Sequence, residues 1–256
     1  MNNFKVERQH DCMQCGIACL QMICNYYGKE YSLDSILPFI RQTAGPRTII
    51  IPILNIYGTG ARVQKELPDC TVLDGCIYVS ASLEHPGVLV QHGPILRVVF
   101  GPRDPSYISP ILSAIQSDLC ESGIDGVLST HIQRDALEKF SYVSPIGASG
   151  VYLHAVAGDF QKEGPARELF KSMIREISAL AATMGYPFEK DYVKINLEIL
   201  SNLSADATTS MQRDIMEGKP SELDGLVMEP LRLAKKYSVS MPCYEEVAKV
   251  LCPLEF

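Results

Sequence analysis

Three cysteines fall within eight residues near the start of the chain, in the stretch RQHDCMQCGIACL at residues 8–20. A thiolate at the start of a helix can act as a nucleophile, whereas a Cys-x-x-Cys pair such as Cys12 and Cys15 can supply half of a zinc site. Structural zinc sites usually have a second such pair, but here Cys15 and Cys19 would share one helix face and Cys24 has no paired partner. We therefore rank metal binding below a nucleophilic or a structural role and predict no metal site.

A second stretch with chemical potential is TTSMQRDIMEGKPSELDGLVMEPLRLAKKYSVSMPCYEEV, residues 208–247. Gly218 is typical of a helix end, and Ser221 followed by Asp224 is typical of the start of a new amphipathic helix. From this spacing alone, Glu222 is most simply a first-turn acid that faces the positive end of the helix dipole.

Three further polar residues have ordinary structural explanations when they are judged by spacing alone. Lys139 lies in DALEKFSYVSPIGASGV and is most simply a solvated helix lysine. Ser210 would be a helix-surface hydroxyl, and Asn55 would be a turn residue at the end of a strand.

Three segments of different character would position these residues. Residues 1–45 read as helix, turn, helix, residues 46–128 as an α/β region, and residues 129–256 as a helical region. The predicted elements of the α/β region are a buried strand from Thr48 (TIIIPILN), a helix at 60–67, strands at 76–82, 88–91 and 96–100, and a helix at 109–122. The predicted helices of the last segment are 132–144, 166–184, 192–203, 205–217, 222–237 and 243–251. The expected fold class is α/β plus all-α.

Composition restricts the function classes. A net charge of −7, with basic residues dispersed among acids, argues against a nucleic-acid partner. No apolar run reaches the roughly 18 residues that span a bilayer, so we expect no membrane insertion. Nine cysteines without a regular framework are better explained as reduced thiols, which predicts a cytoplasmic protein.

Resemblance to a known family favours catalytic or binding roles for these polar residues over the structural explanations. The run Ser210-Met211-Gln212-x-Asp214, then Gly218-Lys219, Ser221-Glu222-Leu223-Asp224 and Val239-Ser240-Met241-Pro242, resembles the C-terminal signature of ketopantoate reductases (2-dehydropantoate 2-reductases). The segment at 135–151 resembles the family's catalytic-lysine segment. The run IIIPILNIYG and the strands that follow it resemble the latter half of the family's nucleotide-binding domain. The resemblance covers about residues 48–256 and implies a truncated Rossmann-like layer followed by the family's helical domain.

The resemblance implies an oxidoreductase that uses NADPH to reduce ketopantoate to pantoate in pantothenate biosynthesis. Lys139 would donate the proton and stabilise the developing alkoxide, and Glu222 would bind the substrate and orient the lysine. Ser210 would bind substrate through its hydroxyl, and Asn55 would lie near substrate and nicotinamide. The implied partner is a small 2-keto acid, and the implied assembly is a homodimer.

One element of the family is missing from the sequence. Ketopantoate reductases begin with a strand, a G-x-G-x-x-G turn and a helix that hold the pyrophosphate of the cofactor. Here Gly58-Thr59-Gly60 is only a G-x-G fragment, and the family's usual Asn-Gly is Asn55-Ile56. We therefore expect the isolated chain to bind NADPH weakly or not at all and to be inactive if the cofactor-binding half is needed in full.

The first 45 residues resemble another family. Gln9, Cys15-Gly16, Ala18-Cys19-Leu20 and Tyr26-Tyr27-Gly28 resemble the start of the cysteine peptidase domain that trims leader peptides in bacteriocin-exporting transporters. The resemblance implies a nucleophile at Cys15 and an oxyanion donor at Gln9. The chemistry also needs a histidine, and nothing in the sequence places any of the later histidines, His85, His92, His131 and His154, beside Cys15. Two alternatives therefore stay open: a peptidase-like or leader-peptide-binding module, and a non-catalytic dimerisation scaffold.

Overall fold

The structure, a computed structural model, describes residues 36–85, 88–218 and 221–253 of the chain. It divides into two compact units. The first comprises Met1–Leu54 and Gly58–Ile132, and the second comprises Asn55–Tyr57 and Gln133–Phe256. The short segment Asn55–Tyr57 therefore belongs to the second unit although both of its neighbours in sequence belong to the first.

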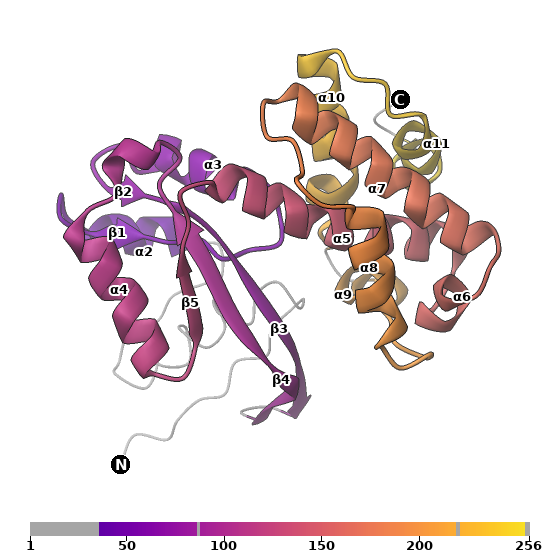
Figure 1. The fold of residues 1–256 in the computed structure, drawn as a ribbon, viewed down its shortest axis with the longest axis horizontal. Coiled ribbons are helices and arrows are strands. Elements are labelled where there is room, and N and C mark those ends of the chain that lie inside the picture. The colour runs from indigo at the N-terminus through magenta and orange to yellow at the C-terminus, as the bar shows by residue number, and fades with distance from the viewer. Residues whose placement is uncertain (1–35, 86–87, 219–220, 254–256) are drawn as a thin grey trace. The chain divides into compact units, whose positions relative to one another are not determined.

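The described part of the first unit contains two small sheets and the helices that flank them (Figure 1). β1 pairs in parallel with β2, while the other sheet has the order β3-β4-β5, antiparallel between β3 and β4 and parallel between β4 and β5. The elements are α2 (Ile36–Thr43), β1 (Ile49–Ile50), α3 (Thr59–Glu66), β2 (Thr71–Val72), β3 (Asp74–His85), β4 (Val88–Gly101), η3 (Pro105–Tyr107), α4 (Pro110–Glu121) and β5 (Asp125–Leu128).

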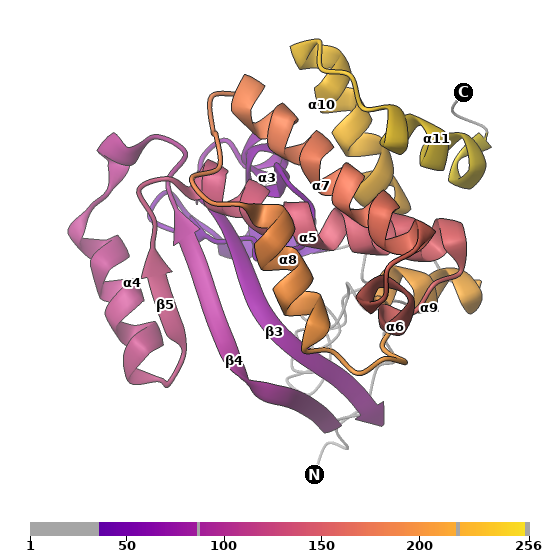
Figure 2. The same cartoon turned by 45° about the vertical axis from the view of Figure 1, so that its right-hand side comes forward.

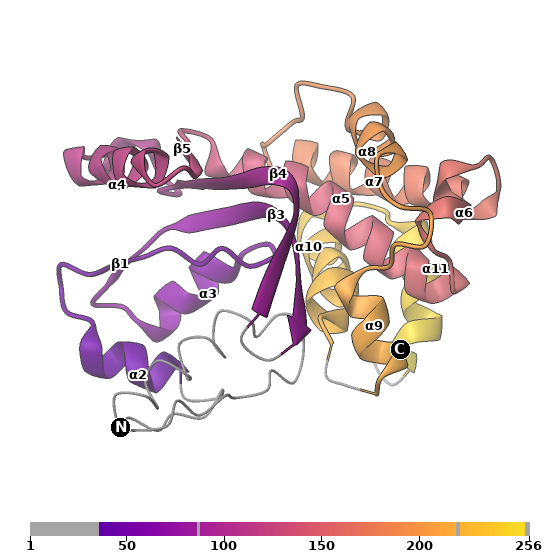
Figure 3. The ribbon, with the colours of Figure 1, turned by 90° about the horizontal axis from the view of Figure 1, so that it is seen from below.

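Alternation along β4 explains how this sheet buries both of its faces. Phe100 packs with Leu112 of α4 in one cluster, and its neighbour Val99 packs with Cys76 of β3 in another. Successive residues of a strand point to opposite faces, so the two clusters lie on the two sides of the sheet. Figure 3 shows α4 and α3 on opposite sides of β3.

Two strand predictions need correction. Of the run that begins at Thr48, only Ile49–Ile50 form a strand, and Ile51 and Ile53 instead pack against the cluster under α4. The β-branched run is therefore explained by burial rather than by a long ladder of hydrogen bonds. The strands expected at 88–91 and 96–100 are one strand, β4, which pairs with β3 along an irregular hairpin (Figure 2).

The second unit is helical, as the sequence predicts, and it packs around α5 and α7. Buried residues of α7 recur every three or four positions, the period of a helix that buries one face. Its elements are α5 (Ile132–Leu153, whose first residue belongs to the first unit), α6 (Ala157–Gln161), α7 (Pro165–Thr183), α8 (Tyr192–Ser201), α9 (Ser210–Met216), η4 (Asp224–Met228), α10 (Glu229–Tyr237) and α11 (Pro242–Leu251).

Helix α5 continues past the end expected at Ser144, through Pro145. Proline has no N–H, so Pro145 cannot donate the hydrogen bond that the carbonyl of Ser141, four residues earlier, would accept in a helix. The buried side chain of Asn196 on α8 supplies the missing donor, with Nδ2 3.0 Å from that carbonyl oxygen. A tertiary hydrogen bond thus lets the helix run through a residue that usually ends one.

Two further helix predictions differ from the structure. The helix expected at 205–217 begins only at Ser210, where Thr209 accepts a hydrogen bond from the backbone N–H of Gln212. The helix expected at 222–237 contains a π-helical stretch, η4, before α10. Within residues 36–85, 88–218 and 221–253, no helix is long and apolar enough to cross a membrane.

Candidate active site

Lys139 and Asn55, two of the residues singled out in the sequence, are in direct contact. Lys139 lies on α5 between the buried Leu137 and Phe140, and its Nζ donates a hydrogen bond to Asn55 Oδ1 over 2.8 Å. Because an ammonium can only donate, the contact fixes the side-chain oxygen of Asn55, rather than its nitrogen, toward the lysine.

The segment that presents Asn55 is held against the same helix two residues later. The Tyr57 hydroxyl donates to Gln133 Oε1 over 2.6 Å, and the Tyr57 ring centroid lies 6.3 Å from that of Phe140. Tyr57 itself is buried. The position of Asn55 beside Lys139 is therefore set by tertiary contacts of its own segment with α5.

Glu222 is buried, with 2% of its surface exposed. An ionised carboxylate is strongly stabilised by water, so burial of this kind is uncommon for an acid whose only role is to face a helix dipole. Its backbone carbonyl accepts a hydrogen bond from the N–H of Leu226 over 2.8 Å. The burial favours a specific role for the Glu222 side chain over the role of a solvated first-turn acid.

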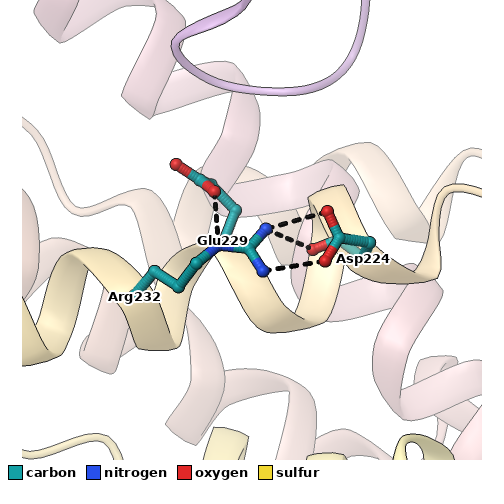
Figure 4. Close-up of polar contacts among 3 residues, drawn as sticks. All are labelled: Asp224, Glu229 and Arg232. Carbon is teal, nitrogen blue, oxygen red and sulfur yellow. Dashed lines mark hydrogen bonds and ion pairs between the residues drawn. The ribbon is translucent and has the colours of Figure 1, made fainter. Parts of the chain in front are cut away.

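Asp224, at this helix start, forms an ion pair with Arg232, which lies eight residues further along the chain. Arg232 donates from both terminal nitrogens to the two carboxylate oxygens of Asp224, each over 2.8 Å, and from Nε to Glu229 over 2.8 Å (Figure 4). The hydrogen bonds that Arg232 donates to Asp224 raise the pKa of Arg232 further above its usual range. Arg232 therefore clamps the first residue of η4 to α10.

A close contact links η4 to the segment that carries Asn55. A Cβ atom added to Gly225 would lie 2.4 Å from Ile56 Cδ1 and 2.6 Å from Ile56 Cγ1, so only glycine leaves room for Ile56. Ile56 follows Asn55 directly, and Gly225 lies three residues after Glu222. The structure thus connects the Lys139–Asn55 pair to the backbone that bears Glu222.

Ser210, the fourth predicted residue, is the half-buried first residue of α9. The two residues after it pack against glycines of α5: a Cβ on Gly147 would lie 3.1 Å from Met211 Cε, and one on Gly150 would lie 2.8 Å from Gln212 Cδ. These glycines bring the start of α9 close to the helix that carries Lys139.

The acid next to Lys139 has partners of its own. Burial raises the pKa of the Glu138 carboxyl, while a hydrogen bond from Tyr192 of α8 and the charge of Arg134 act in the opposite direction. Arg134 also forms an ion pair with Glu189. Glu138 is therefore part of a polar cluster between α5 and the start of α8.

The Gly58-Thr59-Gly60 turn does not fit a phosphate-binding loop. Gly58 adopts a left-handed conformation at the start of α3, but a Cβ on Gly60 would lie 2.0 Å from Asp74 Oδ1 and 2.3 Å from the carbonyl oxygen of Leu73. The space at Gly60 is already filled by protein, so a phosphate cannot approach the backbone there. The glycines here serve the packing of α3 on the sheet.

The other predicted site residues, Cys15 and Gln9, lie outside the residues that the structure describes. Sequence reasoning also missed Ile56 and Tyr57 as parts of the site. The available signal was the departure from the family's Asn-Gly at Asn55-Ile56, which places a large side chain where a small one is usual.

Comparison with known proteins supports two family assignments along the chain. Residues 131–255 match the family described as ketopantoate reductase PanE/ApbA C terminal, and residues 27–105 match the family described as ketopantoate reductase PanE/ApbA. Residues 3–45 match the Peptidase C39 family.

Similar proteins agree with the two reductase matches. A 2-dehydropantoate 2-reductase of Aquifex aeolicus is 24% identical over 87% of this chain and 73% of its own length. The crystal structure of a 2-dehydropantoate 2-reductase from Methylococcus capsulatus has a TM-score of 0.75 at 23% identity, over 86% of this chain and 70% of that protein. A D-mandelate dehydrogenase solved with NADH has a TM-score of 0.73 at 18% identity, over 87% of this chain and 75% of that protein. Residues 27–105 and 131–255, which these two models match, belong to the ketopantoate reductase family.

Proposed function

We propose that the chain acts as a 2-dehydropantoate 2-reductase-type oxidoreductase whose second unit binds a small 2-keto acid and protonates its reduced carbonyl oxygen. The observation that carries the proposal is the 2.8 Å contact between Lys139 Nζ and Asn55 Oδ1, in a unit that also buries Glu222. A lysine ammonium within reach of the substrate oxygen would supply both the positive charge and the proton that this chemistry needs.

Lys139 is the proposed catalytic acid. The ammonium carries three N–H groups, and one of them donates to Asn55. In the reduction of a ketone the carbonyl oxygen gains negative charge, and an ammonium within hydrogen-bond distance stabilises that charge and then transfers a proton. Asn55 limits the conformations of the lysine side chain and so favours this geometry.

Glu222 and Ser210 are the proposed substrate-binding residues. A buried carboxylate can accept hydrogen bonds from substrate hydroxyl groups, and the Ser210 hydroxyl can either donate or accept. A nicotinamide dinucleotide, which the family resemblance implies to be NADPH, would supply the hydride when it is bound. Asn55 is the residue proposed to contact it. The Gly58–Gly60 turn offers no phosphate site for this cofactor. The roles proposed for Lys139, Glu222, Ser210 and Asn55 are therefore limited to binding and proton transfer.

The direct test is consumption of NADPH with ketopantoate, comparing the unaltered chain with Lys139→Ala and Glu222→Gln. Lys194→Ala is the matched control, because Lys194 is an exposed lysine on another helix, α8, of the same unit. The proposal expects loss of turnover in Lys139→Ala and Glu222→Gln and normal turnover in the control. Equal rates in Lys139→Ala and Lys194→Ala would reject it.

A second candidate function rests on the match of residues 3–45 to the Peptidase C39 family. In this proposal Cys15 is the nucleophile and Gln9 the oxyanion donor, and the segment cleaves or binds a double-glycine leader peptide. Cleavage of such a peptide that is lost in Cys15→Ala would support it, whereas thiol labelling without cleavage or binding would not.

We also propose that the chain is a cytoplasmic homodimer, whether it is catalytic or only a scaffold. The formal charge of −7 favours a small-molecule or protein partner over nucleic acid. Gel filtration with light scattering tests this assembly, and a monomer at micromolar concentration would contradict it.

A further inference from the structure

The second proline inside a helix, Pro230, creates the same problem as Pro145 and is resolved by another buried side chain. Pro230 lacks the N–H that would bond the carbonyl of Leu226, four residues earlier in a regular helix. Ser144 on α5 lies at that carbonyl, with Oγ 2.6 Å from Leu226 O. The hydroxyl thus supplies a donor that Pro230 cannot supply.

The direction of the next hydrogen bond follows from the first. Ser144 Oγ is also 2.5 Å from the hydroxyl of Tyr244 on α11. A serine hydroxyl has one hydrogen, and Ser144 uses it on the carbonyl, so the Tyr244 hydroxyl must be the donor. Both side chains are fully buried, and burial raises the pKa of Tyr244, which keeps this donor protonated.

The peptide groups of Leu226 extend this chain of hydrogen bonds to Glu222. The N–H of Leu226 donates to the backbone carbonyl of Glu222 over 2.8 Å, while its own carbonyl accepts from Ser144. The order is therefore Tyr244 hydroxyl, Ser144 hydroxyl, Leu226 peptide, Glu222 carbonyl. Bonds of this kind polarise one another, so each strengthens its neighbour in a dry interior.

The same backbone stretch is π-helical, a form that is rare and often marks functional sites. On another side, Gly225 of this stretch contacts Ile56, next to the asparagine that bonds Lys139. A shift of η4 along its axis would therefore move Glu222 and disturb Asn55 together.

We propose that Ser144 and Tyr244 are positioning residues, which hold the π-helical segment so that Glu222 and the Lys139–Asn55 pair keep their working arrangement. The proposal rests on the proposed function of Glu222 and Lys139 and adds to it the means by which they are positioned. Neither Ser144 nor Tyr244 needs to touch the substrate for this role.

The test compares Ser144→Ala and Tyr244→Phe with Ser149→Ala. Ser149 is a matched control because it is also a buried serine of α5 whose hydroxyl donates to a backbone carbonyl, that of Pro145 within its own helix. We expect kcat for ketopantoate reduction to fall at least tenfold in Ser144→Ala and less in Tyr244→Phe, with a shifted pH profile in both. The control should keep the profile of the unaltered chain even where its Tm falls equally.

A second measurement separates this inference from the proposed function. If the unaltered chain shows no turnover, the proposed function fails. The inference is then tested by the pH titration of the Glu222 carboxyl, which carbon NMR can follow, with Glu222→Gln used to assign its signal. A Glu222 titration that moves in Ser144→Ala and Tyr244→Phe but not in Ser149→Ala supports a positioning role. Identical titrations or identical pH profiles in all three variants would overturn it.

Discussion

Lys139 Nζ lies 2.8 Å from Asn55 Oδ1, although the two residues are 84 positions apart in the chain. Asn55 belongs to a three-residue segment that is part of the helical unit, while its sequence neighbours on both sides are part of the α/β unit. The contact that most directly suggests catalysis therefore forms because the chain places residues 55–57 in the helical unit.

The Ile56–Gly225 contact predicts that a smaller side chain at Ile56 restores stability lost by a larger one at Gly225. Gly225→Ala would place a methyl group 2.4 Å from Ile56 Cδ1, and overpacking of this kind destabilises a protein by about 1–3 kcal/mol. Ile56→Ala in the same chain should restore a large part of the loss, which denaturant unfolding of the two single variants and the double variant can measure. Additive effects would show that the two side chains do not meet.

We expect Asn196 to stabilise the fold through its hydrogen bond to one backbone carbonyl, that of Ser141. Asn196→Ala leaves the carbonyl of Ser141 without the donor that Pro145 cannot provide, and such a loss costs about 1–3 kcal/mol. Asn202→Ala is the control, since the Asn202 side chain also donates to a helix carbonyl, that of Glu198, but at the surface. Unfolding midpoints that fall equally in both variants would refute the argument.

The reactivity of Cys243 should depend steeply on pH. Burial, with a contribution from the nearby Glu176, raises the pKa of the Cys243 thiol to about 11. Only the thiolate reacts, so its alkylation rate should rise about tenfold per pH unit up to that pKa and be very slow near neutrality. Peptide mass spectrometry after timed iodoacetamide treatment measures this, and labelling of Cys243 at pH 7 as fast as that of the exposed Cys120 would contradict it.

Cofactor affinity should be low in the isolated chain. The space beside Gly60 is filled by Leu73 and Asp74, and the sequence contains no G-x-G-x-x-G fingerprint. Fluorescence titration with NADPH should therefore show no saturation in the micromolar range. A micromolar dissociation constant would mean that phosphate binding is provided by residues other than this turn.

The helical half of the fold was predictable because its signals are local. Apolar residues every three or four positions and the prolines at helix starts place α7, α8 and α11 within a few residues. Strand β1 was over-predicted because a β-branched run has the same composition whether it pairs in a sheet or is only buried. Family membership, from the motifs at 135–151 and 208–247, agrees with the comparisons.

The arrangement of the candidate site was less predictable because it depends on tertiary contacts. The π-helical stretch falls in an amphipathic pattern that looks like one regular helix, and only Pro230, four residues after Leu226, hints at the missing donor. Nothing in the spacing shows that Ser144 would supply it. The burial of Glu222 was likewise invisible, since a first-turn acid and a buried site carboxylate occupy the same place in the sequence.

The most direct test of the central claim is the rate of ketopantoate reduction at millimolar NADPH, a concentration chosen to offset weak cofactor binding. The account predicts measurable turnover that falls at least about a hundredfold in Lys139→Ala, the usual loss when a general acid is removed, and stays unchanged in Lys194→Ala. Turnover in Lys139→Ala equal to that of the unaltered chain, or none at all in the unaltered chain, would contradict it.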